Sequence, residues 1–298
     1  MESRQQSIGH IAAIFTVSVW GATFVSTKVL LRHFTAEEIL FLRFLMGMIA
    51  LWVIKPKPMK LKKKSDLLYF VGAGLTGLVL YYFCENVALC YGDASLIGVI
   101  VCTAPIFSGI LSNIFLKEKL KAGFFIGFLV SMIGLIILSW SAQMGGTKIQ
   151  GIVLAFIGAI AWGFYSVITR KVAILGYNSF GTTQYTFLFA VIMMIPIAVL
   201  SKFRIHAVFS MDLVTLGNLL FLGLCASAIC FVTWNFAVKK LGVVRSSVYI
   251  YASPVITVIL ATIFLGERMG VKEIIGTILV LSGLLLSEGK SRKGREDE

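Results

Sequence analysis

Long runs of apolar residues, separated by short polar segments, occupy most of the chain. Runs such as 10–31, 67–91, 122–142 and 151–169 have roughly the length of about 20 residues that crosses a bilayer as a helix. Backbone polar groups in lipid must be satisfied within the element itself, which favours helices. The pattern predicts an all-α polytopic membrane protein with ten transmembrane helices. The predicted spans are 8–31, 37–54, 67–90, 94–115, 121–140, 150–170, 180–200, 213–238, 246–265 and 271–288.

The apolar pattern also repeats within the chain. The segment Val99–Glu118 (VIVCTAPIFSGILSNIFLKE) recurs as Val248–Glu267 (VYIYASPVITVILATIFLGE), at an offset of 149 residues. The first span repeats at an offset of 142, which places Lys28 on Arg170. The matched pairs include Pro105 with Pro254, Glu118 with Glu267, Asn86 with Asn235, Gly127 with Gly276, Gly134 with Gly283, Trp20 with Trp162 and Gly21 with Gly163. This regularity indicates an internal duplication.

The duplication predicts two five-helix halves, residues 1–142 and 143–298, the second with a basic cytoplasmic tail. Five spans per half is an odd number, so the second half is expected to be inverted relative to the first. Inverted repeats are typical of secondary transporters, whose substrate site lies near the midplane between the repeats.

Charge is scarce and unevenly placed. Charged residues make up 14% of the chain, against about 25% in soluble domains, and the mean hydropathy is +0.92. The net charge is +13, and most lysines and arginines fall in the loops on the side of the two termini. This asymmetry predicts that both termini are cytoplasmic. No basic segment alternates with aromatic residues, so we expect no nucleic-acid partner.

The two halves, the paired Trp-Gly of spans one and six, and the A-P-(x12)-E and S-P-(x12)-E segments resemble the drug/metabolite transporter superfamily, specifically its EamA-type exporters. The resemblance covers about residues 8–288. It implies a proton-linked or facilitated carrier in the cytoplasmic membrane that exports amino acids or other small metabolites.

Three charged residues are predicted to lie inside the membrane, and they come from three different spans. Glu85 is the acidic residue that lies well inside a span, with Arg43 at a similar depth and Lys28 nearer the surface. Such groups usually face a cavity or a partner. In a functional interpretation, Glu85 carries protons or binds a cationic group, while Arg43 or Lys28 holds a substrate carboxylate. In a structural interpretation, Glu85 pairs with Arg43 and Lys28 reaches the headgroups.

Further candidates lie at matched positions of the two halves. Pro105 and Pro254 are expected to kink their spans and to free the carbonyls of Val101 and Ile250. Mid-span tryptophans line a cavity or pack in the core, and the asparagines bind substrate or bridge helices. The candidate substrate-binding or translocation residues are Trp20, Lys28, Arg43, Tyr82, Glu85, Asn86, Pro105, Trp162, Trp234, Asn235, Tyr249 and Pro254. Tyr81 and Tyr251 are weaker candidates. Glu118 and Glu267 are expected to cap the following span or to meet Lys119 or Arg268.

Several alternatives compete with a carrier. The chain has no phosphate-binding G-x4-G-K-[ST] motif, no H-E-x-x-H motif and no evident Ser/His/Asp set, so we expect neither an ATP-driven pump nor an enzyme, and neither a cofactor nor a metal. The five cysteines are interpreted as core packing. A lipid flippase on the same fold remains as an alternative, whereas a structural or interaction protein would not require two inverted halves. The expected partners are a small metabolite, the lipid bilayer and protons, and the expected state is a monomer or homodimer.

Overall fold

The computed structural model describes residues 2–117, 122–144, 147–204, 208–241, 246, 249–250, 252–267 and 269–288. These residues form helices and connecting turns, and no strand occurs among them. The elements of the first half are α1 (Glu2–Leu30), α2 (Ala36–Ile54), the 3-10 helix η1 (Lys64–Asp66), α3 (Leu67–Ala73), the π-helix η2 (Gly74–Leu80), α4 (Tyr81–Tyr91), α5 (Ala94–Val101), α6 (Ala104–Leu116) and α7 (Ala122–Met144). Those of the second half are α8 (Ile149–Ile174), α9 (Ser179–Leu200), α11 (Leu213–Leu220), the π-helix η3 (Phe221–Ile229), α12 (Cys230–Leu241), α14 (Ser253–Leu265) and α15 (Val271–Glu288).

Within the described residues, six helical stretches are long and apolar enough to cross a membrane. They are Gln6–Leu30, Lys64–Tyr91, Ala94–Leu116, Ile149–Ile174, Ser179–Leu200 and Leu213–Leu241, and shorter apolar helices cover Ser253–Leu265 and Ile274–Gly283. Large apolar side chains such as Leu129 and Ile278 are exposed on the outside of the bundle, as expected for surfaces that face lipid. The all-helical class is confirmed, and the count of ten spans stays a prediction.

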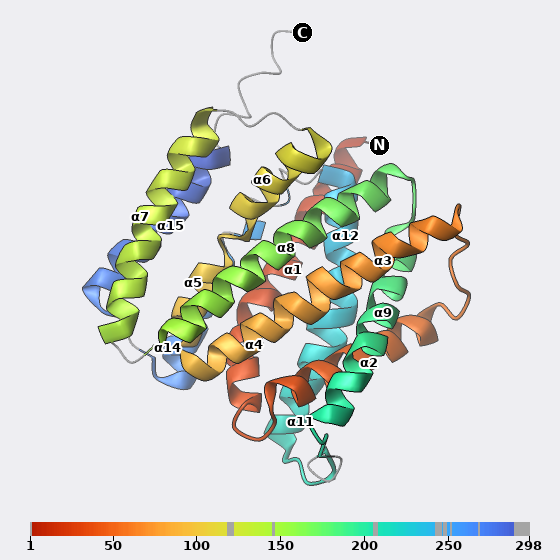
Figure 1. Ribbon diagram of the computed structural model, residues 1–298, viewed down its shortest axis with the longest axis horizontal. Helices are drawn as coiled ribbons and strands as arrows, with labels where there is room; N and C mark the ends of the chain where they lie inside the picture. The colour runs from red at the N-terminus through yellow and green to blue at the C-terminus, as the bar shows by residue number, and fades with distance from the viewer. Residues whose placement is uncertain are drawn as a thin grey trace.

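The helices run in alternating directions between two ends of the bundle (Figure 1). We call the end where α1 begins and α6, α8 and α12 finish the terminal face. We call the end where α4 finishes and α5 and α8 begin the distal face. Since α1 leaves the terminal face and α8 leaves the distal face, the first helices of the two halves run in opposite senses (Figure 1).

The two π-helices occupy matched positions. Residues 74–80 of η2 fall on 223–229 at the offset of 149, within η3. Each packs against the opposite half, η2 on α8 and α9 and η3 on α1 and α2. The π-helix is rare and is frequently found at functional sites. The repeat therefore places a π-helix at the same position in each half, and each π-helix packs on the other half.

Glycine allows close helix packing where the two halves meet at the edge formed by α7 and α15, which lie together in Figure 1. A Cβ on Gly134 would come 2.7 Å from the backbone oxygen of Gly276, and one on Gly283 would come 2.5 Å from that of Gly127. Ser131 also donates to a carbonyl of α15. Each of these two glycines of α7 therefore meets the glycine of α15 that is not its own repeat match, Gly134 with Gly276 and Gly127 with Gly283.

Candidate translocation site

Three tryptophans meet at the centre of the bundle. The Trp20 ring lies 5.5 Å from that of Trp162, nearly edge-on at 88°, and 5.2 Å from that of Trp234. The Trp20 indole also donates to the carbonyl of Ala226 in η3 at 3.1 Å. Trp20 and Trp162, which the repeat matches, come from α1 and α8. Both residues pack in the core and also line the cavity described next, so core packing and cavity lining are not exclusive alternatives for them.

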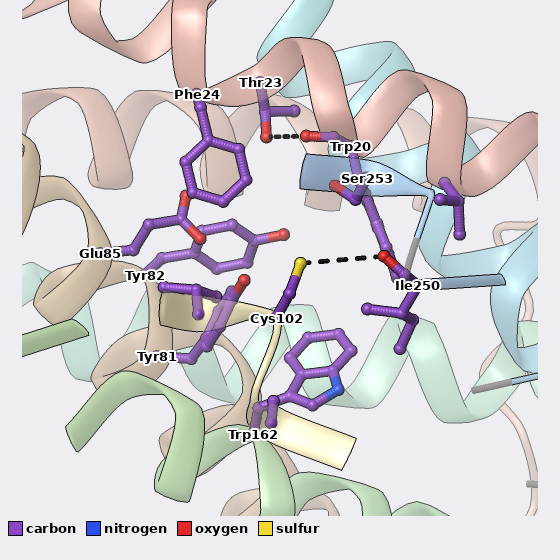
Figure 2. Close-up of a pocket in the computed structure, with 13 residues that line it drawn as sticks. Trp20, Thr23, Phe24, Tyr81, Tyr82, Glu85, Cys102, Trp162, Ile250 and Ser253 are labelled. Atoms are coloured by element: carbon purple, nitrogen blue, oxygen red, sulfur yellow. Dashed lines mark hydrogen bonds between the residues drawn. The ribbon is translucent and has the colours of Figure 1, made fainter. Parts of the chain in front are cut away.

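A cavity of about 40 Å³ lies beside these rings (Figure 2). It is lined by Val17, Trp20, Thr23 and Phe24 of α1, by Tyr81, Tyr82 and Glu85 of α4, by Trp162 of α8, and by Val101, Cys102, Ala104, Ile250 and Ser253 at the helix breaks described below. Its volume holds about three water molecules at roughly 10–15 Å³ each. The described conformation therefore leaves no room for a metabolite.

Two helix breaks border the cavity, and they correct the expectation of mid-span kinks. The predicted span 94–115 is divided into α5 and α6 by a turn at Cys102–Thr103. Pro105 and Pro254 lie in the first turns of α6 and α14. Amides of the first turn have no intrahelical acceptor, so the missing N–H of proline costs no helix hydrogen bond there. The prolines therefore begin new helices instead of bending continuous ones.

The carbonyl expected to be freed at Ile250 accepts a hydrogen bond from the Cys102 thiol, with the sulfur 3.8 Å from the oxygen (Figure 2). Cys102 belongs to the first half and Ile250 to the second, so the two breaks meet across the cavity. The sequence interpretation of the cysteines as packing missed this position. Its place three residues before Pro105 in the repeated segment was the available signal.

Glu85 is the carboxylic acid among the residues that line the cavity. The residue is 1% exposed, and its Oε1 has no hydrogen-bond partner among the described residues. Figure 2 shows its carboxylate and the hydroxyls of Tyr81 and Tyr82 directed into the same space. A buried carboxylate with an oxygen that lacks a hydrogen-bond partner is costly, and intramembrane acids of this kind usually serve a pathway or a ligand.

Arg43 is fully buried but forms no ion pair with Glu85 in the described part of the chain. Its Nε donates to Ser227 Oγ of η3 at 3.1 Å, and its Cζ lies 4.1 Å from the centre of the Tyr82 ring. Its two terminal nitrogens have no partner among the described residues. Arg43 packs against Tyr82 and is not among the residues that line the cavity. The predicted pairing of Arg43 with Glu85 is therefore not seen as a direct contact.

Lys28 has a local structural role. Its ammonium donates to the carbonyls of Leu89 at 2.6 Å and Gly92 at 2.5 Å. These are the unsatisfied carbonyls at the end of α4, where a cation is favourable. Lys28 therefore caps α4 and is not among the residues that line the cavity.

The remaining candidates divide between bridging and unpaired groups. Asn235 donates to Thr183 Oγ1 at 2.9 Å and so joins α12 to α9, whereas its match Asn86 is fully buried without a side-chain partner among the described residues. Tyr249 Oη and His10 Nδ1 are hydrogen-bonded at 2.5 Å. Tyr251, Glu118 and Arg268 lie outside the described residues.

A second cavity of about 20 Å³ lies on the terminal side of the tryptophans. It shares Trp162 and Ile250 with the first cavity and is otherwise lined by Pro105, Ser108, Tyr165, Ser166, Thr169, Trp234, Val238 and Ser246. The two cavities are therefore consecutive, and Trp162 and Ile250 form the partition between them.

Comparison with known proteins decides the family. The profile of the EamA-like transporter family matches the chain twice, over residues 7–140 and 149–288. The chain belongs to the EamA-like transporter family. Relatives with a similar sequence include an uncharacterized transporter of Clostridium kluyveri, 26% identical with 97% of this chain and 95% of the relative covered.

Two further comparisons extend this result. A protein of Streptantibioticus cattleyicolor described as a probable terminal-alkyne amino-acid exporter is 25% identical, with 92% of this chain and 91% of the relative covered. A solved structure titled "Crystal structure of protein" matches with a TM-score of 0.66 at 20% identity and full coverage of both chains. That likeness supports the fold alone.

Proposed function

We propose that the chain is a secondary transporter of the cytoplasmic membrane that exports amino acids or other small metabolites by alternating access. The observation that carries the proposal is the central cavity, where two broken helices from opposite halves meet beside the buried carboxylate of Glu85. Discontinuous helices around a midplane cavity are the usual form of a secondary-transporter site.

The internal symmetry supports two inverted repeats, residues 1–142 and 143–298. Gly21 of α1 lies where an added Cβ would come 2.8 Å from Ile256 of α14, and Gly163 of α8 where it would come 3.0 Å from Leu111 of α6. The matched Trp-Gly pairs thus make matched contacts with the opposite half. Two halves that pack equivalently give two arrangements of similar free energy, one open to each face.

Hydrogen bonds join connecting segments at both faces of the described residues. At the terminal face the Tyr177 hydroxyl donates to Asp66 Oδ2 at 2.6 Å, and the Lys62 amide donates to the Tyr177 oxygen at 2.9 Å. Burial, reinforced by the hydrogen bond to Asp66, raises the pKa of Tyr177, so this donor stays protonated. At the distal face the Lys148 amide donates to the Tyr91 carbonyl at 2.9 Å.

The polarity of the cavity suits an amino acid. Glu85 offers a carboxylate to an ammonium group or a proton, and the first turns of α6 and α14 offer the positive ends of two helices to a carboxylate. Ala104 and Ser253 bring these turns to the cavity wall. The amino-acid exporter of Streptantibioticus cattleyicolor supports this substrate class.

The test is uptake by proteoliposomes that contain the wild type, Glu85→Gln or Glu37→Gln, with a panel of labelled amino acids and a long-chain lipid. Glu37 is a matched acid in the first turn of α2, outside the cavity. We expect amino-acid flux in the wild type and in Glu37→Gln, and loss of about tenfold or more in Glu85→Gln, equivalent to about 1.4 kcal/mol or more. Flux of the lipid alone would contradict the proposal and favour a flippase.

A further inference from the structure

Buried polar atoms without hydrogen-bond partners collect on the distal side of the cavity. Six of the ten such side-chain atoms in the described part of the chain belong to Thr27, Arg43, Glu85 and Asn86. These residues come from α1, α2 and α4, and each is at most 1% exposed. Buried polar groups are normally hydrogen-bonded, so a group of free ones calls for an explanation. We call Thr27, Arg43 and Asn86 the distal cluster.

The distal cluster continues the cavity wall towards the distal face. Thr23 of α1 and Tyr82 of α4 line the cavity. Thr27 follows Thr23 by four residues, so it lies one turn further along the same helix face. Asn86 follows Tyr82 in the same way. Since α4 finishes at the distal face and α1 runs towards it (Figure 1), the distal cluster lies between the cavity and that face.

Arg43 is held so that one edge of its guanidinium stays free. Its Nε donates to Ser227 Oγ at 3.1 Å, and its Cζ lies 4.1 Å from the centre of the Tyr82 ring. These contacts occupy one edge and one face of the group. Nη1 and Nη2 have no partner among the described residues. Two neighbouring guanidinium nitrogens match the two oxygens of a carboxylate, so the free edge has the chemistry of a carboxylate site.

Asn86 and Thr27 bring neutral donors to the same region. Neither the amide nitrogen nor the amide oxygen of Asn86 has a partner in the described part of the chain, and the Thr27 hydroxyl is also free there. An amide nitrogen and a hydroxyl can donate to the remaining lone pairs of a carboxylate bound by arginine. Asn235, the repeat match of Asn86, instead donates to Thr183. The free amide is therefore particular to the first half.

Two carboxylates of the protein nearer the distal face already have hydrogen-bond partners. Glu38, on the same helix as Arg43, binds Arg204 through both oxygens. Glu267 Oε1 accepts from the Ala94 amide at 3.0 Å, and its Oε2 accepts from the Ser95 amide at 3.1 Å and hydroxyl at 2.6 Å. These amides open α5 although Glu267 follows α14, so the expectation that Glu267 caps the following span names the wrong helix. Neither acid serves the distal cluster.

We propose that Arg43, Asn86 and Thr27 bind the carboxylate of the exported substrate as it passes from the cavity towards the distal face. Tyr82 is the side chain that moves to admit it, because its hydroxyl is directed into the cavity while its ring covers the guanidinium of Arg43 (Figure 2). Glu85 precedes Asn86 in α4 and lines the cavity. The ammonium of an amino acid stays on Glu85 while its carboxylate moves from the first turns of α6 and α14 to the distal cluster. The proposal rests on the export function proposed above.

The test is thermal unfolding of the purified protein in detergent, with sodium propionate as the probe. Propionamide has the same shape without the charge, and sodium chloride at equal concentration controls for ionic strength. A ligand at about ten times its Kd should raise the wild-type midpoint by roughly 3–6 °C. We expect this rise with propionate but not with propionamide or chloride. Arg43→Gln should lose the rise, and Arg32→Gln, at an exposed position, should keep it.

Variants of similar shape separate binding from a structural role. Asn86→Leu and Thr27→Val break no side-chain hydrogen bond of the described residues. They remove buried polar atoms, so each should raise the midpoint without ligand. Each should also reduce the propionate rise by about half or more, because a donor to the carboxylate is lost. Asn235→Leu is the matched control: it breaks the bond to Thr183, so it should lower the midpoint without ligand and keep the full rise.

Several results would overturn the proposal. Propionate that stabilises the wild type no more than propionamide does would do so, as would a full rise in Arg43→Gln or in Asn86→Leu. A lower midpoint of Asn86→Leu without ligand would make Asn86 a structural residue. If Arg43→Gln does not fold, Asn86→Leu and Thr27→Val decide the outcome. Propionate binding requires no transport, so a failure here and a failure of the uptake experiment are separate results.

Discussion

Among the glycines of the described residues, Gly77 is the one at which an added Cβ would lie nearest to another atom. In Gly77→Ala the new Cβ would lie 2.1 Å from Cδ2, 2.4 Å from Cγ and 2.7 Å from Cε2 of Tyr165. Carbon atoms at optimal contact lie about 3.5–4.0 Å apart, so the ring must move by more than an ångström. Tyr165 is 2% exposed, and its ring lies 4.9 Å from that of Trp162, which limits the room for that movement.

The expected magnitude follows from two opposing effects. Overpacking of a buried site costs about 1–3 kcal/mol or somewhat more, while glycine-to-alanine replacement within a helix gains up to about 1 kcal/mol. We expect Gly77→Ala to lose about 1–2 kcal/mol. Gly217, in α11, has no atom within 4 Å of an added Cβ, so Gly217→Ala is the matched control and should gain up to about 1 kcal/mol.

The assay is thermal unfolding in detergent, with uptake measured in parallel. One kcal/mol corresponds to roughly 2–4 °C for a chain of this order of size, so the two alanine variants should move the midpoint in opposite directions. Because the displaced Tyr165 ring presses on Trp162, the partition between the two cavities, Gly77→Ala should also slow transport. Equal midpoints for the two variants would refute the packing of η2 against α8.

Three further predictions concern the prolines, the acidic cap of α11 and the topology. Pro105→Ala and Pro254→Ala should fold, because the first-turn amide has no intrahelical partner, but should transport more slowly as the breaks close; unchanged turnover in both would leave the prolines with no part in transport. The hydrogen bonds from Thr215 hold the pKa of Asp212 below its ordinary value, so its stabilising effect is present above about pH 4 and is lost as the pH falls through the lowered pKa. The difference in melting midpoint between wild type and Asp212→Ala should therefore disappear in acid, and a constant difference down to pH 3 would contradict it. Reporters at Lys62 and after the last residue should be cytoplasmic and one at Lys148 external, and an external signal at Lys62 would overturn the ten-span topology.

The sequence predicted those features that depend on local pattern. Apolar run length located the helices, and the repeat matched positions that the structure brings together, such as Trp20 with Trp162. The helices can be predicted from the sequence because a bilayer requires apolar helices of a minimum length. Close contact between helices further requires small residues at the crossing points.

The features that the sequence did not predict depend on long-range geometry. A proline in an apolar run is compatible with a kink or with a new helix, and the turn at Cys102–Thr103 that decides between them is stabilised by the Thr103 hydroxyl on the Ile100 carbonyl. The partner of Glu267 is 173 residues away. Depth alone placed Arg43 near Glu85, whereas the intervening Tyr82 ring depends on how α2 and α4 face each other.

We propose further that the Glu85 carboxylate in the cavity couples transport to protons, and this is the central claim to test. The most direct measurement is amino-acid flux in proteoliposomes under a series of imposed pH gradients, for wild type and Glu85→Gln, with thermal unfolding to establish that both are folded. Glu85 has no ion-pair partner among the described residues, so we expect the variant to keep the wild-type melting midpoint while its flux no longer responds to the gradient. A stable variant with wild-type flux at every gradient would contradict the claim.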